Sequence, residues 1–157
     1  MQETFITKNS KETQKLGEIL AKELKDGKII ALEGDLGCGK TTFTQGFLKG
    51  LRIKGPYTSP TFVVMKQYHK AHNKKQKTKN KGMLHVPCSM FQNIYHIDAY
   101  RVNSKDILSL GWQEITGNKK NVIIIEWADR IKKIIPADAL WIKFEWISEK
   151  ERKISIK

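Results

Sequence analysis

The segment 34–41 contains residues that could bind the phosphate groups of a nucleotide. Its sequence, GDLGCGKT, matches the pattern GxxxxGK[ST] in full. Glycines allow backbone torsions that turn several N–H groups toward one point, where phosphate oxygens can accept hydrogen bonds. Lys40 would reach the β- and γ-phosphates, and the hydroxyl of Thr41 would ligate Mg²⁺. The alternative is a glycine-rich turn in which Lys40 and Thr41 are ordinary residues of a first helical turn.

Cys38 lies inside this segment and allows two interpretations. A thiol close to the start of a helix could be sensitive to oxidation. The interpretation we favour is that a small side chain is tolerated here because only the backbone contacts the ligand.

Two carboxylates could serve the metal ion. In open α/β sheets, ligands bind outside the carboxyl ends of the strands, where a phosphate loop with Mg²⁺ usually needs an acid. Glu126 ends the apolar run 122–125, and Asp98 ends the run 93–98. We predict that Glu126 ligates Mg²⁺; the alternative is a salt bridge to Arg130. Asp98 would hold the metal through water or orient the attacking water; the alternative is a cap for the turn that follows.

A polar loop at 58–61, TSPT, follows the break at 55–56. Such a loop could fold over the γ-phosphate, as switch segments do in related NTPases, and Thr61 would then offer its hydroxyl. The alternative is a plain turn whose shape is set by Pro60.

His96 is a weaker candidate. Strand alternation points its side chain to the face opposite its neighbours Tyr95 and Ile97. We interpret His96 as a structural histidine with satisfied hydrogen bonds and not as a ligand.

The chain alternates between strand and helix patterns that would position these residues. Strands are expected at 2–7, 28–33, 61–68, 93–98, 121–127, 140–146 and 152–156, the last two as a hairpin. Helices are expected from an N-cap at Ser10 to Gly27, over 43–51, from Ser104, and over 128–135. The phosphate loop follows a strand and opens a helix. We therefore predict an α/β fold, a three-layer sandwich of the P-loop NTPase type with a central mixed β-sheet and a C-terminal β-hairpin.

Composition limits the class of protein. The 157 residues suit one domain, 1–157, and 39% hydrophobic with 29% charged residues exclude wholesale disorder. Lys and Arg number 29 against 16 Asp and Glu, and the net charge of +13 favours polyanionic partners without choosing among them. Two cysteines without a CxxC pair argue against a disulfide scaffold or a cysteine zinc site. With no signal peptide and no run near the ~20 apolar residues of a membrane span, we expect a soluble, cytoplasmic protein without a membrane partner.

Four segments together resemble a known family. GDLGCGKTTF at 34–43, SPTF at 59–62, HIDAYR at 96–101 and IEW at 125–127 occur in this order. The combination resembles the bacterial TsaE (YjeE) family, small P-loop ATPases needed for threonylcarbamoyladenosine in tRNA. The likeness extends over nearly the whole chain, which would make it a single P-loop ATPase domain.

The resemblance implies an activity and partners. TsaE-like proteins hydrolyse ATP weakly and act with TsaD and TsaB, which install the group on the adenosine beside the anticodon; TsaE is not the transferase. By likeness, catalysis would involve Lys40, Asp98 and Glu126, and Mg²⁺ would be held by Thr41 and Glu126. ATP or ADP would be bound by Ser10, Leu36, Gly37, Cys38, Gly39, Lys40, Thr41, Thr42 and Thr61. Trp127 would lie beside the site.

A basic insertion at about 69–91 departs from the family pattern. From 66 to 82 there are seven lysines, two histidines and no acidic residue. The segment could touch tRNA phosphates, but it lacks the interleaved aromatic residues that stack on bases. A solvated loop is the interpretation we favour, with tRNA contacted indirectly or through this arm.

Two other functions stay open at this stage. A small-molecule P-loop kinase would usually need an arginine-rich lid, and the few arginines of the chain form no such cluster. A nucleic-acid-binding protein with an incidental phosphate loop would explain the basic arm. The complete loop and the two acids at strand ends argue against it.

Overall fold

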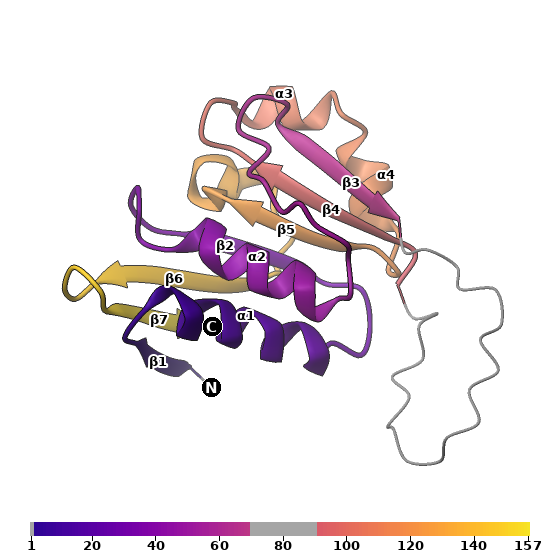
Figure 1. The fold of residues 1–157 in the computed structure, drawn as a ribbon. Helices are drawn as coiled ribbons and strands as arrows, with labels where there is room; N and C mark the ends of the chain where they lie inside the picture. The colour runs from indigo at the N-terminus through magenta and orange to yellow at the C-terminus, as the bar shows by residue number, and fades with distance from the viewer. Residues whose placement is uncertain (1, 70–90) are drawn as a thin grey trace, which may run out of the picture.

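The computed structural model describes residues 2–69 and 91–157, and a seven-stranded sheet forms the middle of this part of the chain. The strands lie in the order β1-β7-β6-β2-β5-β4-β3 (Figure 1). The four inner strands β6, β2, β5 and β4 are parallel, whereas β3, β7 and β1 each pair antiparallel with a neighbour at the two sides. Their bounds are Glu3–Thr7 (β1), Ile29–Glu33 (β2), Met65–His69 (β3), Asn93–Asp98 (β4), Val122–Glu126 (β5), Leu140–Trp146 (β6) and Arg152–Ile156 (β7).

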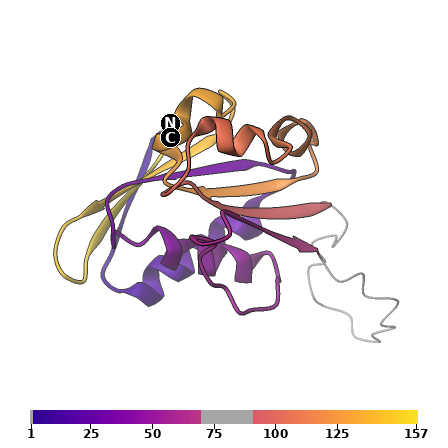
Figure 2. The same ribbon diagram turned by 90° about the horizontal axis from the view of Figure 1, so that it is seen from above.

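Helices cover both faces of the sheet. α1 (Ser10–Glu23) and α2 (Lys40–Gly50) lie on one face, and α3 (Ser104–Leu108), α4 (Trp112–Gly117) and the 3₁₀ helix η1 (Ala128–Ile134) lie on the other (Figure 2). The residues facing α1 and α2 form one apolar cluster, and those facing α3, α4 and η1 form a second. The predicted three-layer α/β fold with a mixed sheet and a C-terminal hairpin is confirmed.

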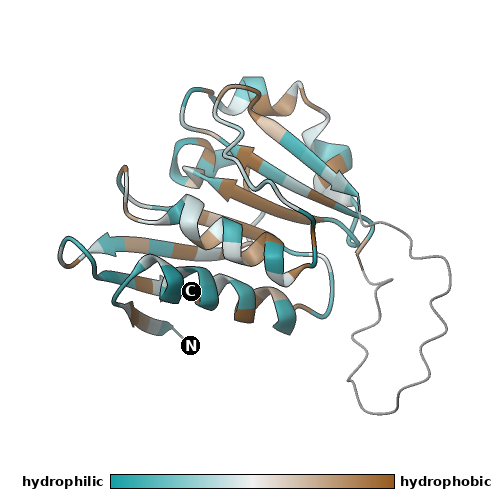
Figure 3. Cartoon of the chain, viewed as in Figure 1, coloured by the Kyte–Doolittle hydropathy of each residue, from teal (hydrophilic) through white to brown (hydrophobic). Residues whose placement is uncertain are grey.

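The β5 strand shows why the sequence folds this way. All five residues of VIIIE are buried, and the strand is brown along most of its length in Figure 3. Parallel strands covered by helices on both faces need apolar side chains at successive positions, not alternate ones. β5 accordingly lies inside the sheet, between β2 and β4.

The helices α1 and α2 are in close contact because glycine occupies a position between them. A Cβ at Gly46 would overlap the carbonyl oxygen of Gln14. The contact holds the start of α1 near the start of α2, where the phosphate loop ends.

Three expected boundaries were wrong by a few residues. The N-cap of α1 is Asn9, whose side chain accepts a hydrogen bond from the Glu12 amide at 2.9 Å, so Ser10 is the first helical residue. The same helix ends at Glu23, before Gly27. The expected strand 61–68 begins only at Met65, because a turn precedes it.

That turn is built on Pro60. Its carbonyl oxygen accepts hydrogen bonds from the amides of Val63 and Val64, and Val64 has a positive φ of 64°. The backbone therefore changes direction before β3 begins.

The predicted basic insertion falls mainly on residues 70–90, which lie outside the described part of the chain. Its first residue, His69, ends β3, and Phe91 packs into the cluster on the α1–α2 face. Within residues 2–69 and 91–157, no helix combines the length and apolar character that crossing a membrane requires.

Candidate functional site

The phosphate loop joins the carboxyl end of β2 to the start of α2. Gly34, Gly37 and Gly39 have φ values of 138°, 74° and 105°, a backbone region that favours glycine. Gly39 is the N-cap of α2, and no side chain of the described residues caps this helix end. The first amides of α2 are therefore left for a ligand, and the positive end of the helix dipole favours an anion.

Lys40 folds back over this loop. Its Nζ donates hydrogen bonds to the carbonyl oxygens of Gly34 at 2.6 Å and Asp35 at 2.8 Å, and lies 3.6 Å from the centre of the Trp127 ring. The side chain is only 4% exposed. A buried ammonium held by carbonyl dipoles and an aromatic face is available to exchange these contacts for phosphate oxygens.

Trp127 provides the aromatic face because of an unusual backbone. It has φ 60° and ψ 39°, and it is the N-cap residue of η1, directly after β5. The Tyr100 ring packs on it with ring centres 4.8 Å apart. The expected place of Trp127 beside the loop agrees with this geometry.

Thr41 and Glu126 meet between α2 and β5. The Thr41 hydroxyl donates to Glu126 Oε2 at 2.5 Å, and His96 Nε2 lies 2.8 Å from Glu126 Oε1. Glu126 is 2% exposed. Among the described residues Glu126 forms its ion pair with His96 and none with the alternative partner Arg130, whose guanidinium lies 5.5 Å from the centre of the Tyr100 ring.

Thr41 and Glu126 fit the metal that the sequence predicts. Mg²⁺ takes oxygen ligands, commonly one or two protein groups with the rest supplied by phosphates and water. A hydroxyl and a carboxylate already within hydrogen-bond distance, next to the phosphate loop, are such a pair.

Asp98 lies beside Glu126 in register across β4 and β5 but has its own partners. Its Oδ2 accepts hydrogen bonds from the hydroxyls of Thr61 at 2.6 Å and Ser59 at 2.8 Å, and its Oδ1 accepts from the Tyr100 amide at 3.0 Å. Asp98 thus caps the turn after β4, as the alternative interpretation held, and also anchors the 58–64 loop.

Two adjoining pockets surround the loop. A pocket of about 140 Å³ is lined by Leu36, Gly37, Gly39, Lys40, Thr41, Thr42, Glu126 and Trp127. A second, of about 370 Å³, is lined by Asn9, Ser10, Thr13, Gly37, Gly39, Thr42, Glu149, Lys150 and Arg152. They share Gly37, Gly39 and Thr42, and this links Ser10 at the start of α1 to the phosphate loop.

Most of the predicted site residues therefore line these two pockets, and the three that line neither are Cys38, Thr61 and Asp98. Cys38 is fully buried in the apolar cluster on the α1–α2 face, and its Sγ lies 3.6 Å from Lys40 Nζ. Burial raises the pKa of this thiol, an effect that nearby Lys40 partly offsets. Thr61 lines neither pocket, because its hydroxyl is held by Asp98.

Three residues that contribute to the site were not predicted from the sequence. The sequence favours a structural role for His96, although its spacing of two residues from Asp98 places both side chains on the same sheet face. Ser59, the second hydroxyl on Asp98, carried no signal of its own. Arg152 comes from the hairpin, where its guanidinium lies 3.7 Å from the Trp146 ring centre and donates to Gly37 O at 3.4 Å.

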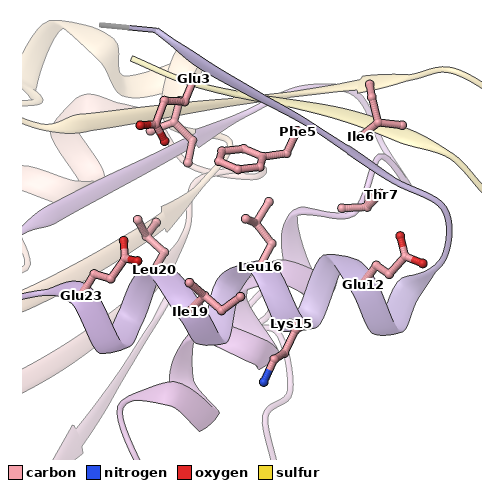
Figure 4. A pocket seen from close by; sticks show the side chains of 11 residues that line it. Glu3, Phe5, Ile6, Thr7, Glu12, Lys15, Leu16, Ile19, Leu20 and Glu23 are labelled. Carbon is pink, nitrogen blue, oxygen red and sulfur yellow. The ribbon is translucent and has the colours of Figure 1, made fainter.

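A further hollow of about 480 Å³ between β1 and α1 is chemically different (Figure 4). Phe5, Leu16 and Leu20 point into it, with Glu3 and Glu23 at one end. It has none of the phosphate-binding features of the loop.

Comparison with known proteins decides the family. The family model for "Threonylcarbamoyl adenosine biosynthesis protein TsaE" matches residues 7–154. The chain belongs to the TsaE family. The resemblance predicted from the four segments is thereby confirmed, and the chain is a member of a family of tRNA threonylcarbamoyladenosine biosynthesis proteins.

Individual TsaE proteins match over most of their length. The TsaE protein of Bacillus subtilis is 35% identical over 149 residues, an alignment that covers 95% of this chain and 81% of the relative. The TsaE protein of Aquifex aeolicus is 33% identical over 153 residues, an alignment that covers 96% of this chain and 92% of the relative. The crystal structure of YdiB from Bacillus subtilis superposes with a TM-score of 0.69 at 30% identity, covering 99% of this chain and 84% of the other.

Proposed function

We propose that this TsaE family member is a Mg²⁺-dependent ATPase subunit of cytoplasmic tRNA threonylcarbamoyladenosine modification. It binds ATP and hydrolyses it to ADP and phosphate, acts with TsaB and TsaD, and does not itself transfer the threonylcarbamoyl group. The observation that carries the proposal is the meeting of Lys40, Thr41 and Glu126 beside the uncapped start of α2.

The chain's own groups account for binding and charge stabilisation. The loop amides donate hydrogen bonds to oxygens of the β- and γ-phosphates, and Lys40 turns from the carbonyl oxygens of Gly34 and Asp35 to the phosphate oxygens. Thr41 and Glu126 would hold Mg²⁺, which would supply positive charge against the phosphates when bound. The pocket beside Ser10 and Arg152 is the space for the ribose and base.

Weak turnover alone fits the arrangement near the γ-phosphate. Asp98 is the acid that would orient the attacking water, yet in this structure three hydrogen bonds engage it. Releasing Thr61 and Ser59 from Asp98 would free its Oδ2. A partner that stabilises the released loop would therefore raise the rate.

Exposed apolar side chains near the loop support dependence on a partner. Leu36, in the phosphate loop, is 73% exposed, and Phe62 and Val63, next to Thr61, are 86% and 61% exposed. Exposed apolar side chains in the phosphate loop and in the 58–64 loop suit a protein interface. We propose that the TsaB–TsaD pair binds there. Contact with tRNA is then indirect or through the basic arm.

Calorimetric titration of ATP in Mg²⁺ tests the site. The wild-type chain should bind ATP, and Lys40→Ala should bind none measurably. Lys49→Ala is the matched control, because Lys49 lies on the same helix but is 68% exposed, and it should bind like the wild type. Equal ATP binding by the wild type and Lys40→Ala would refute the assignment.

A further inference from the structure

The buried hydrogen bond of His96 has a consequence for the metal site. His96 Nε2 lies 2.8 Å from Glu126 Oε1, and the side chains of both residues are 2% exposed. They come from adjacent parallel strands, β4 and β5, on the face that carries α2. His96 is not within the set that lines the phosphate pocket, so it acts on that pocket only through Glu126.

The direction of this hydrogen bond follows from the chemistry of the carboxylate. An ionised carboxylate accepts only, so Nε2 carries the hydrogen and donates it. Nδ1 of His96 has no hydrogen-bond partner among the described residues. Glu126 is therefore the single polar contact described for this imidazole, which ties its orientation to that carboxylate.

The two oxygens of Glu126 have different partners. Oε2 receives the Thr41 hydroxyl, while Oε1 receives His96. When Thr41 turns its oxygen lone pairs toward a cation, its hydrogen bond to Glu126 is lost, and His96 is then the remaining described contact that restrains rotation of the carboxylate. Restraint of a ligating carboxylate by a buried donor raises metal affinity, since less orientational freedom is lost on binding.

We propose that His96 is a positioning residue that orients Glu126 for Mg²⁺ in this TsaE family member. The proposal rests on the proposed function, since it needs a metal and nucleotide at this site. It assigns to His96 no contact with substrate, metal or the reacting atoms.

Two substitutions separate positioning from packing. His96→Leu replaces the imidazole by an apolar side chain of similar size and so removes the hydrogen-bond donor. His96→Gln retains an amide N–H that can reach Glu126 from nearly the same place. Asn121→Ala is the control for a lost buried hydrogen bond, because Asn121 lies at the opposite end of β5 and donates to Ile115 O.

The readout is Mn²⁺ binding to the ADP-loaded full chain, followed by electron paramagnetic resonance, together with ADP affinity in EDTA. His96→Leu should weaken Mn²⁺ affinity by about 10-fold or more and change metal-free ADP affinity less than about twofold. His96→Gln should recover most of the loss, and Asn121→Ala should match the wild type. In the Glu126→Gln background, adding His96→Leu should lower the Mn²⁺ affinity no further.

The outcomes distinguish this inference from the function on which it rests. If the wild type binds no ADP at all, the proposed function fails and the inference fails with it. If the wild type binds ADP and Mn²⁺ and a folded His96→Leu binds both equally well, only the inference is overturned. Equal weakening of metal-free ADP binding would also overturn it, because that pattern indicates general disruption.

Discussion

Replacing Thr61 by valine removes one of the two hydroxyls that hold the 58–64 loop on Asp98. Valine keeps the shape of threonine, so the change removes the hydrogen bond of 2.6 Å to Asp98 Oδ2 together with the 2.8 Å hydrogen bond between the same hydroxyl and Ser59 Oγ. A hydrogen bond to a charged group contributes about 1.5–3 kcal/mol, and Asp98 is only 4% exposed, so solvent screens it little. We expect local opening of the loop to become easier by about 2 kcal/mol, which corresponds to about 30-fold.

Amide hydrogen exchange measures this opening directly. The amides of Val63 and Val64 donate to Pro60 O at 2.9 and 2.7 Å, so their exchange requires the turn to open. Thr116→Val is the matched control, because that hydroxyl donates to a neutral carbonyl in α4 on the other face of the sheet. Exchange at Val63 and Val64 that rises less than about threefold in Thr61→Val would refute the role given to Asp98 as the anchor of the loop.

Further outcomes follow from the site and its packing. Glu126→Gln should leave ATP binding in EDTA intact and lower Mg²⁺-dependent turnover by about 100-fold or more, measured as phosphate release, because the charged metal ligand is lost; near-normal turnover would count against the metal role. Because burial raises the pKa of the Cys38 thiol above its ordinary value, iodoacetamide at pH 7.5 should modify it far more slowly than in urea, as peptide mass spectrometry would show. In the unfolded chain this thiol loses its proton at lower pH, so its contribution to stability should decline above about pH 9. Gly46→Ala should lower the free energy of urea unfolding by several kcal/mol, because its Cβ would overlap the Gln14 carbonyl; an unchanged midpoint would contradict the close contact of α1 with α2.

The parts of the site that the sequence predicted are those with local signals. The loop at 34–41 is contiguous, and its glycines must adopt torsions that other residues avoid. Glu126 and Asp98 each end an apolar strand, and parallel strands bring such ends to one edge of a sheet. The register of Asp98 opposite Glu126 confirms this inference about their placement.

The remaining contacts join residues distant in sequence and carry no local pattern. Thr41 and Glu126 are 85 positions apart, and the contact of Glu126 with His96 depends on strand order. Strand alternation predicts that His96 and Asp98 share a sheet face. It does not predict that His96 lies within hydrogen-bond distance of Glu126. Arg152 reaches the loop because the predicted hairpin of β6 and β7 lies beside β2 in the sheet, and this placement has no local signal in the sequence.

The central claim is tested most directly by ATP hydrolysis of the purified chain in Mg²⁺, with and without purified TsaB–TsaD from the same source. The proposed function predicts slow release of phosphate by the chain alone, a clear increase with the pair, and loss of both rates in Lys40→Ala. An equal rate of hydrolysis with and without TsaB–TsaD would contradict the partnership. A rate that persists in Lys40→Ala would contradict the site itself.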